Sequence, residues 1–259
     1  MAKEGTAVAR AKVNLPTDVN AAMAAEMAEM QKRIAAPSGN RITVTQSKTF
    51  KFPNGLESPD PFEAVVIDFA AANYYYADAY DRNNVTPPVC FALGLEPAGL
   101  SPADSSPEKQ AGACAACWAN QFGSSGKGKA CQNTRLLAVI PTDADSETPI
   151  WLVKVSPTAI RVFDAHVGAV GRSYNMPVRA VITEFSFDPN SEYASLRFRT
   201  IGPAPKELVM LAHGMKDEAQ KLLLTEPTVQ AVGADTKKVA GPASRKPAGK
   251  PATKPAARH

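Results

Sequence analysis

The chain has 259 residues, of which 44% are hydrophobic, enough for a packed core in one large domain or two small ones. No apolar run approaches the roughly 18 residues that a membrane-spanning helix needs, so no membrane partner is expected. The formal net charge is +4. Residues 233–259 hold seven Lys and Arg and one acid, a net +6, which leaves −2 for the rest of the chain. The basic character therefore lies in the tail.

Residues 1–40 are predicted to form an N-terminal arm and one helix. Between 17 and 35, apolar side chains from Val19 to Ile34 recur every three or four residues, the spacing of one helix face. A Pro-Ser-Gly triplet at 37–39 ends the pattern.

Residues 41–204 are predicted to form a β core. Strand patterns occur at 41–46, 48–52, 63–69, 89–93, 135–140, 150–155, 178–187 and 193–201. The last two flank the turn sequence Asp188–Ser191 and predict a β-hairpin. A short helix is expected at 158–170. Because the strands do not alternate with regular helices, a doubly wound parallel sheet is disfavoured.

Residues 205–227 are predicted to form a C-terminal helix that begins at Pro205 and ends at Pro227. The fold class is therefore α+β. Strand number and spacing fit an antiparallel β-barrel of the OB type with an inserted cysteine loop at 88–135. An open antiparallel sheet covered by the terminal helices is the alternative.

All four cysteines of the chain lie between positions 90 and 131: Cys90, Cys114, Cys117 and Cys131. The spacing of Cys114 and Cys117 lets two thiolates bind one metal from a single turn. Four thiolates match the tetrahedral preference of Zn²⁺, and with no open coordination position the metal is expected to be structural. The enclosed segment is poor in core residues, so we expect the metal to order it.

Two other interpretations of these cysteines stay open, namely two disulfides or a redox-active Cys-x-x-Cys pair. The start of the chain, Met1–Glu4, runs into polar sequence without the apolar region of a signal peptide. A reducing cytoplasm is therefore expected, where such spacing favours a metal.

Aromatic and basic residues near the cysteines are candidates for nucleic-acid contact, through base stacking and phosphate binding respectively. The stacking candidates are Tyr74, Tyr75, Tyr76, Trp118 and Phe122. The phosphate-binding candidates are Lys48, Lys51, Lys127, Lys129 and Arg135. The alternative is that Trp118 and Phe122 cover the metal site while Lys127 and Lys129 are merely solvated.

The tail, residues 228–259, is rich in Ala, Pro, Gly and Lys and has no apolar face to bury. It is predicted to be disordered in isolation and to contact nucleic-acid phosphates without sequence preference. A tail that only aids solubility is the alternative.

Enzyme signatures are scarce, so no catalytic residue is assigned and the protein is expected to be non-enzymatic. The three histidines do not form a metal or triad pattern. The Gly/Ser segment 120–131 lacks the Gly-Lys-Ser/Thr ending of a phosphate loop and the preceding buried strand, which argues against nucleotide hydrolysis.

Three runs around the cysteines carry a family resemblance: Pro87–Ala92, Cys114–Cys117 and Phe122–Arg135. Over roughly residues 60–140 the chain resembles bacteriophage proteins found with replication genes, and zinc-bearing single-stranded DNA-binding proteins of phages that carry a metal loop in an OB-fold. The resemblance implies binding of single-stranded DNA, with RNA left open, during replication or recombination in the host cytoplasm.

One departure from this resemblance affects the expected partners. Such phage proteins usually end in an acidic tail that recruits replication proteins, whereas this tail is basic. The departure favours a tail that contacts DNA directly. The alternative function is a zinc-stabilised structural or adaptor protein that binds a polymerase or a virion component, with a nonspecific nucleic-acid-binding tail.

Overall fold

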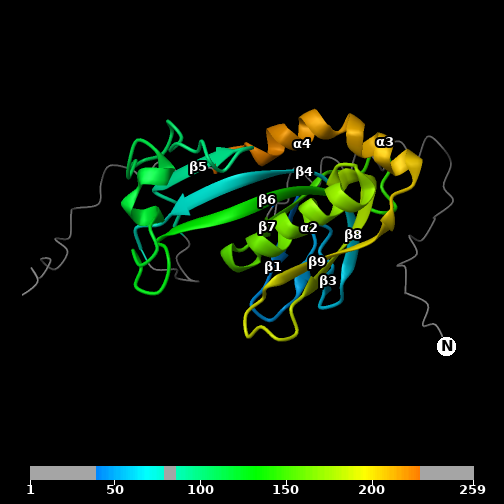
Figure 1. Cartoon of the computed structure of the whole chain (residues 1–259), viewed down its shortest axis with the longest axis horizontal. Coiled ribbons are helices and arrows are strands. Elements are labelled where there is room, and N and C mark those ends of the chain that lie inside the picture. The colour runs from blue at the N-terminus through cyan, green and yellow to red at the C-terminus, as the bar shows by residue number, and fades with distance from the viewer. Residues whose placement is uncertain (1–38, 79–85, 228–259) are drawn as a thin grey trace, which may run out of the picture. The chain divides into compact units, whose positions relative to one another are not determined.

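A computed structural model of the chain describes residues 39–78 and 86–227 (Figure 1). The helix expected at 17–35 and the tail at 228–259 lie outside the described residues. No helix in the described part of the chain is long and apolar enough to cross a membrane.

The centre of the fold is a nine-stranded sheet. Its strands are β1 (Arg41–Val44), β2 (Phe50–Lys51), β3 (Glu57–Ser58), β4 (Phe62–Tyr75), β5 (Cys90–Gly94), β6 (Cys131–Pro141), β7 (Trp151–Val155), β8 (Val181–Phe187) and β9 (Leu196–Pro203). They lie in the order β3-β2-β1-β7-β6-β4-β8-β9, and β5 pairs with the far end of β4. Every expected strand is present, and only β3 was not predicted.

The expectation of a purely antiparallel sheet is wrong at one pair, because β1 runs parallel to β7 and aligns Arg41 with Leu152. Residue alternation predicts which face a side chain occupies but not the direction of a neighbouring strand. A parallel pair needs a long connection, and here β2 to β6 supply it. The fold is α+β, with a mixed sheet curled into a half-barrel.

Aromatic packing between distant strands accompanies this curl. The rings of Phe50 on β2 and Phe187 on β8 stack with centroids 4.3 Å apart. Phe62 of β4 packs edge-on against Phe50 at 4.8 Å and stacks on Phe185 at 4.7 Å. Strands near the two ends of the sheet therefore share one hydrophobic core.

Strand β4 is the longest element of the sheet and is buried on both faces. The ring of Phe69 packs against Phe163 of helix α2 (Ile160–Tyr174) at 5.1 Å. The neighbouring Asp68 accepts a hydrogen bond of 2.8 Å from Gln220 of helix α4 (Lys216–Leu223). Because adjacent strand residues point to opposite faces, α2 and α4 cover opposite sides of the sheet.

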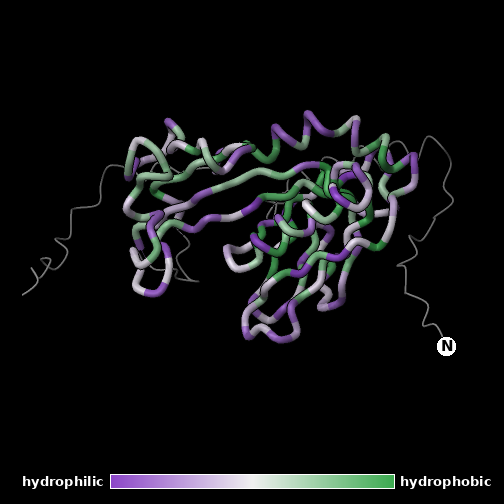
Figure 2. The backbone as a smooth tube through the Cα atoms, in the orientation of Figure 1, coloured by the Kyte–Doolittle hydropathy of each residue, from purple (hydrophilic) through white to green (hydrophobic). Residues whose placement is uncertain are grey.

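Helix α2 confirms the helix expected at 158–170 and extends it to Tyr174. Phe163, His166 and Val170 form its buried face, and Asn175 ends it in a left-handed conformation with φ of 50°. Figure 2 shows hydrophobic stretches gathered where α2 overlaps the strands, with hydrophilic stretches in the outer loops.

The C-terminal helix predicted at 205–227 is two helices, α3 (Lys206–Gly214) and α4, which meet at Met215. Their buried side chains are Leu208 and Ala212 on α3 and Ala219 and Leu223 on α4. The predicted hairpin is confirmed, since β8 and β9 pair antiparallel along their length.

Candidate cysteine cluster and nucleic-acid interface

Two cysteines lie on strands and two on a turn. Cys90 begins β5 and Cys131 begins β6, and both are aligned with Tyr75 of β4, one on each side of it. Residues aligned across neighbouring strands share a face of the sheet, so the two thiols project from the same side. Cys114 and Cys117 bound a single 3₁₀ turn, in which the Cys117 N–H bonds the Cys114 carbonyl.

All four cysteines are free and buried, and they line one cavity of about 10 Å³. Its volume is close to the roughly 10–15 Å³ that one water molecule needs. Over residues 39–78 and 86–227, no three or more His, Cys, Asp or Glu side chains stand at the spacing of a metal site. The four thiols nevertheless line the same cavity. A set of four thiols is the donor set of a structural Zn²⁺ site.

Hydrogen bonds from two amide side chains hold the turn that carries Cys114 and Cys117. The side-chain N–H of Asn120 donates to the Cys114 carbonyl at 2.8 Å. That of Gln121 donates to the carbonyls of Ala115 at 3.1 Å and Cys117 at 3.3 Å. The turn is thus shaped by protein groups before any metal binds.

The electrostatics of the cluster oppose ionised thiols. Burial and, to a smaller extent, charges on the other three cysteines raise the pKa of the Cys131 thiol to about 12. The positive charge of Lys129 has the opposite, smaller effect. Burial also raises the pKa of Cys114, while a hydrogen bond with the Asn73 side chain lowers that pKa by a smaller amount. Cys114 and Cys131 therefore remain protonated unless a cation offsets the charge, which is what a bound Zn²⁺ does.

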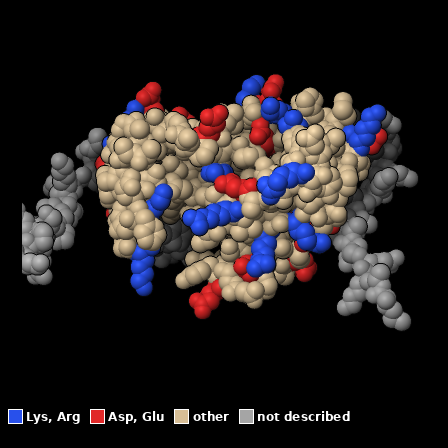
Figure 3. All heavy atoms as spheres, in the orientation of Figure 1, with Lys and Arg blue, Asp and Glu red and all other residues tan. Residues whose placement is uncertain are grey.

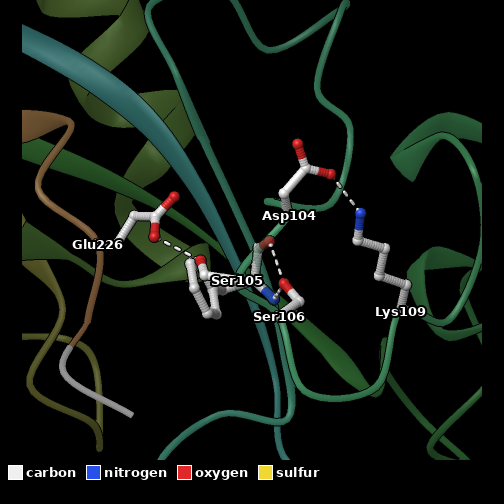
Figure 4. A network of polar contacts seen from close by, with 6 residues as sticks. Asp104, Ser105, Ser106, Lys109 and Glu226 are labelled. Atoms are coloured by element: carbon white, nitrogen blue, oxygen red, sulfur yellow. Dashed lines mark hydrogen bonds and ion pairs between the residues drawn. The ribbon is translucent and has the colours of Figure 1, made fainter.

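Hydrogen bonds and an ion pair also anchor the segment between Cys90 and Cys114, which the sequence did not predict (Figure 4). The Ser106 hydroxyl accepts from the N–H of Phe91 at 3.1 Å and donates to its carbonyl at 3.0 Å, as a neighbouring strand would. Asp104 pairs with Lys109, and Ser105 donates to Glu226, the third residue after α4.

The segment between Cys117 and Cys131, which we call the cysteine-flanked loop, is also internally hydrogen-bonded. Gly123 and Gly126 adopt φ of 93° and 80°, a region that disfavours side chains. The Ser124 hydroxyl donates within the loop and accepts from the Ala130 N–H at 2.9 Å. These bonds tie the loop to itself, and most of its residues are exposed.

The aromatic candidates fall into two groups. Phe122 is 82% exposed and Trp118 is 52% exposed, both on the cysteine-flanked loop. Tyr75 is partly buried and packs edge-on against Trp118 at 5.6 Å. Tyr74 is only 7% exposed and Tyr76 is partly buried. The structure thus brings Tyr75 and Trp118 together and leaves Phe122 as the most accessible ring.

Three of the five candidate cations bond acidic side chains or backbone carbonyls of the described chain. The Lys48 ammonium donates to two carbonyls of the β8–β9 turn, at 3.1 and 2.7 Å. Lys51 pairs with Glu57 on β3 at 2.6 Å. Arg135 forms two bonds to Asp164 of α2, at 3.2 and 3.1 Å. A phosphate would have to displace these partners before it could contact the three cations.

The other two cations, Lys127 and Lys129, are exposed on the cysteine-flanked loop. Lys129 donates to the neutral side chain of Asn120 at 3.1 Å. No acidic group among the described residues pairs with Lys127 or Lys129. Their charges therefore remain available to an anionic ligand.

No family model, curated protein or solved structure matches the chain.

Sequence reasoning missed a second group of cations, Arg41 on β1 and Lys154 on β7. The Lys154 ammonium lies 5.0 Å from the centroid of the Tyr74 ring, within cation–π range. Burial raises the pKa of Tyr74 and of Tyr76, and in each case the positive charge of Arg41 opposes the rise. A charged residue inside the apolar run of β7 was the available signal.

Proposed function

We propose that the protein binds single-stranded DNA, in the replication or recombination of a phage genome, through the cysteine-flanked loop. One observation carries this proposal. The most exposed ring among the candidates, Phe122, lies on the same loop as Lys127 and Lys129, the two candidate cations that bond neither an acid nor a backbone carbonyl in the described chain. Exposed aromatics with nearby cations are what nonspecific single-strand binding requires.

The physical preference for single strands comes from the rings. A base that is already unstacked gains about 1–3 kcal/mol by stacking on an aromatic side chain, whereas a base in a duplex must first leave its neighbours. The cations contribute attraction to any nucleic-acid backbone. The loop therefore selects single strands through Phe122 and Trp118, and Lys127 and Lys129 add affinity.

A structural Zn²⁺ on Cys90, Cys114, Cys117 and Cys131 completes the proposal. Cys117 and Cys131 flank the loop, and Cys90 and Cys131 begin β5 and β6. A metal there would fix the position of the exposed rings and reduce the entropy lost when DNA binds. The tail, which lies outside the described residues, would add nonspecific phosphate contact through its seven cations.

The adaptor function remains as a second candidate because of the surface charge. Figure 3 shows basic and acidic side chains interspersed on the face it displays, without a continuous basic field. Large nucleic-acid channels are usually lined by one sign of charge. An exposed ring such as Phe122 also suits a protein partner, as does Met210 on α3, which is 61% exposed.

A competition titration on the full-length protein separates the two candidates. A fluorescent thymidine oligonucleotide is bound at low salt and then competed with unlabelled single strand or with duplex of equal length. The proposal expects the single strand to compete better. Equal competition by both forms assigns the binding to charge alone and favours the adaptor function.

A further inference from the structure

A second surface feature, separate from the cysteine-flanked loop, lies beside β1. Strands β1 and β7 pair at only two positions, ending at Ile42 and Val153. Beyond them the walls of a groove of about 570 Å³ include Thr43 of β1 and Lys154 of β7. Such a volume falls within the roughly 300–1,000 Å³ of small-molecule sites in proteins.

The charged residues among the described lining of the groove share one sign of charge. Arg41 and Lys154 both line it, and none of the described residues along it is acidic. Neutral hydrogen-bonding groups complete the polar part, from Gln132 on β6 and from Ser156 and Thr158 ahead of α2. Two cations with amide and hydroxyl donors form a site for an anion.

The two cations also act on one another. The positive charge of Arg41 lowers the pKa of Lys154, in the same direction as the larger effect of burial. Lys154 is exposed as a residue, while its ammonium lies over the Tyr74 ring. A bound anion would be attracted by both positive charges, so the arrangement favours a negatively charged ligand.

The remainder of the groove is suited to a base and a sugar. The partly buried Val44 supplies apolar surface, and Tyr193, which is 74% exposed, stands along it. A phosphate beside the cations and a ring against the apolar part together describe a nucleotide. An inorganic anion would leave the apolar part unused.

We infer that the groove between β1 and β7 binds a phosphate-bearing nucleotide, with the phosphate on Lys154 and Arg41. If that nucleotide belongs to a DNA strand, the inference rests on the proposed function. The groove is then a second site of contact with the strand, in addition to the cysteine-flanked loop. Gln132 lines the groove and the preceding Cys131 lines the cysteine cavity, so the two sites lie on opposite faces of β6.

Two substitutions in the full-length protein test the groove. Lys154→Gln removes one cation. Thr43→Glu places an acid at an exposed position of the groove, which is aligned with Lys51 of β2. Because the new carboxylate is exposed and can pair with a neighbouring cation, this variant should remain folded. Lys221→Gln on α4 is the control, because Lys221 is exposed and does not line the groove. Thermal melts establish that each variant is folded.

The ligands are a fluorescent thymidine oligonucleotide, titrated at several salt concentrations, and free thymidine monophosphate, followed by NMR shifts. Loss of one phosphate contact lowers the log–log salt slope by about 0.7, a loss of about fivefold in affinity at 0.1 M salt. We expect that loss in Lys154→Gln, an equal or larger loss in Thr43→Glu, and a change of less than about twofold in the Lys221→Gln control.

The two ligands distinguish the source of the nucleotide. Weaker oligonucleotide binding in both groove variants assigns the site to a strand, and weaker binding of the monophosphate alone assigns it to a free nucleotide. If both ligands bind the folded groove variants as they bind Lys221→Gln, the inference is overturned while the proposed function stands. Lys154-dependent binding of the monophosphate without any oligonucleotide binding refutes the proposed function and keeps the groove. Binding of neither ligand to the unaltered protein refutes both.

Discussion

Replacing Phe122 by alanine should weaken single-strand binding without destabilising the fold. The ring is 82% exposed, so truncation removes little buried area and the free energy of unfolding should change by no more than about 0.5 kcal/mol. Loss of a stacked base costs about 1–3 kcal/mol. At about 1.4 kcal/mol per tenfold, the dissociation constant should rise about 5- to 140-fold.

The assay is fluorescence anisotropy with a labelled thymidine oligonucleotide at two or more salt concentrations. Because Phe122 is uncharged, the salt slope should not change even though the affinity falls. Phe122→Tyr keeps an aromatic face and should bind within about twofold of the unaltered protein. Met210→Ala, which truncates an exposed apolar side chain on α3, is the matched control and should have no effect.

The leucine variant separates stacking from simple apolar contact. Phe122→Leu keeps most of the apolar surface but loses the aromatic face, so stacking predicts a loss close to that of the alanine variant. Normal binding by Phe122→Leu together with weak binding by Phe122→Ala would point to apolar contact and favour the adaptor function. Normal binding by both variants refutes the role of this ring.

Three further predictions concern metal, charge and pH. Elemental analysis of the purified protein should find one Zn²⁺ per chain, and Cys117→Ala should release it and lower the melting temperature; four free thiols without metal contradict the site. Substituting both Lys127 and Lys129 by alanine should lower the log–log salt slope by about 1.4, as measured by titration, whereas an unchanged slope removes them from the interface. Burial lowers the pKa of His166 below its ordinary 6.5, and its ring bonds the Thr183 hydroxyl. Below about pH 6.5 the unfolded chain therefore binds a proton that the folded chain resists, and stability should fall. Urea unfolding between pH 7.5 and 5.5 should show a smaller fall in His166→Gln, and an equal fall excludes this histidine as the cause.

The strands were predictable because their signals are local. Alternating or continuous apolar residues mark β1, β4 and β6 through β9 in the sequence, and the Asp188–Ser191 turn marks the hairpin. The parallel pairing of β1 with β7 has no local signal, since it depends on how the intervening strands are arranged. The break between α3 and α4 was missed because the apolar spacing continues through Met215.

The candidate site was predictable only in part, for the same reason. The grouping of the cysteines follows from their spacing, and the structure places all four on one cavity. The engagement of Arg135 by Asp164 and of Lys48 by the β8–β9 turn could not be predicted, because these partners are 29 and at least 140 residues apart in sequence. Lys154 carried a usable signal, a cation inside an apolar strand, but its proximity to Arg41 depends on the parallel pairing.

The central claim is that the folded body, rather than the basic tail, recognises single strands. The most direct measurement removes Gly233–His259 and compares the affinity of the remaining protein for single-stranded and duplex DNA of equal length at low salt. The account predicts that the truncated protein binds, with a flatter salt dependence than the full chain, and that it prefers the single strand, because exposed rings favour unstacked bases. A truncated protein that is folded but ignores single strands contradicts the account and favours the adaptor function.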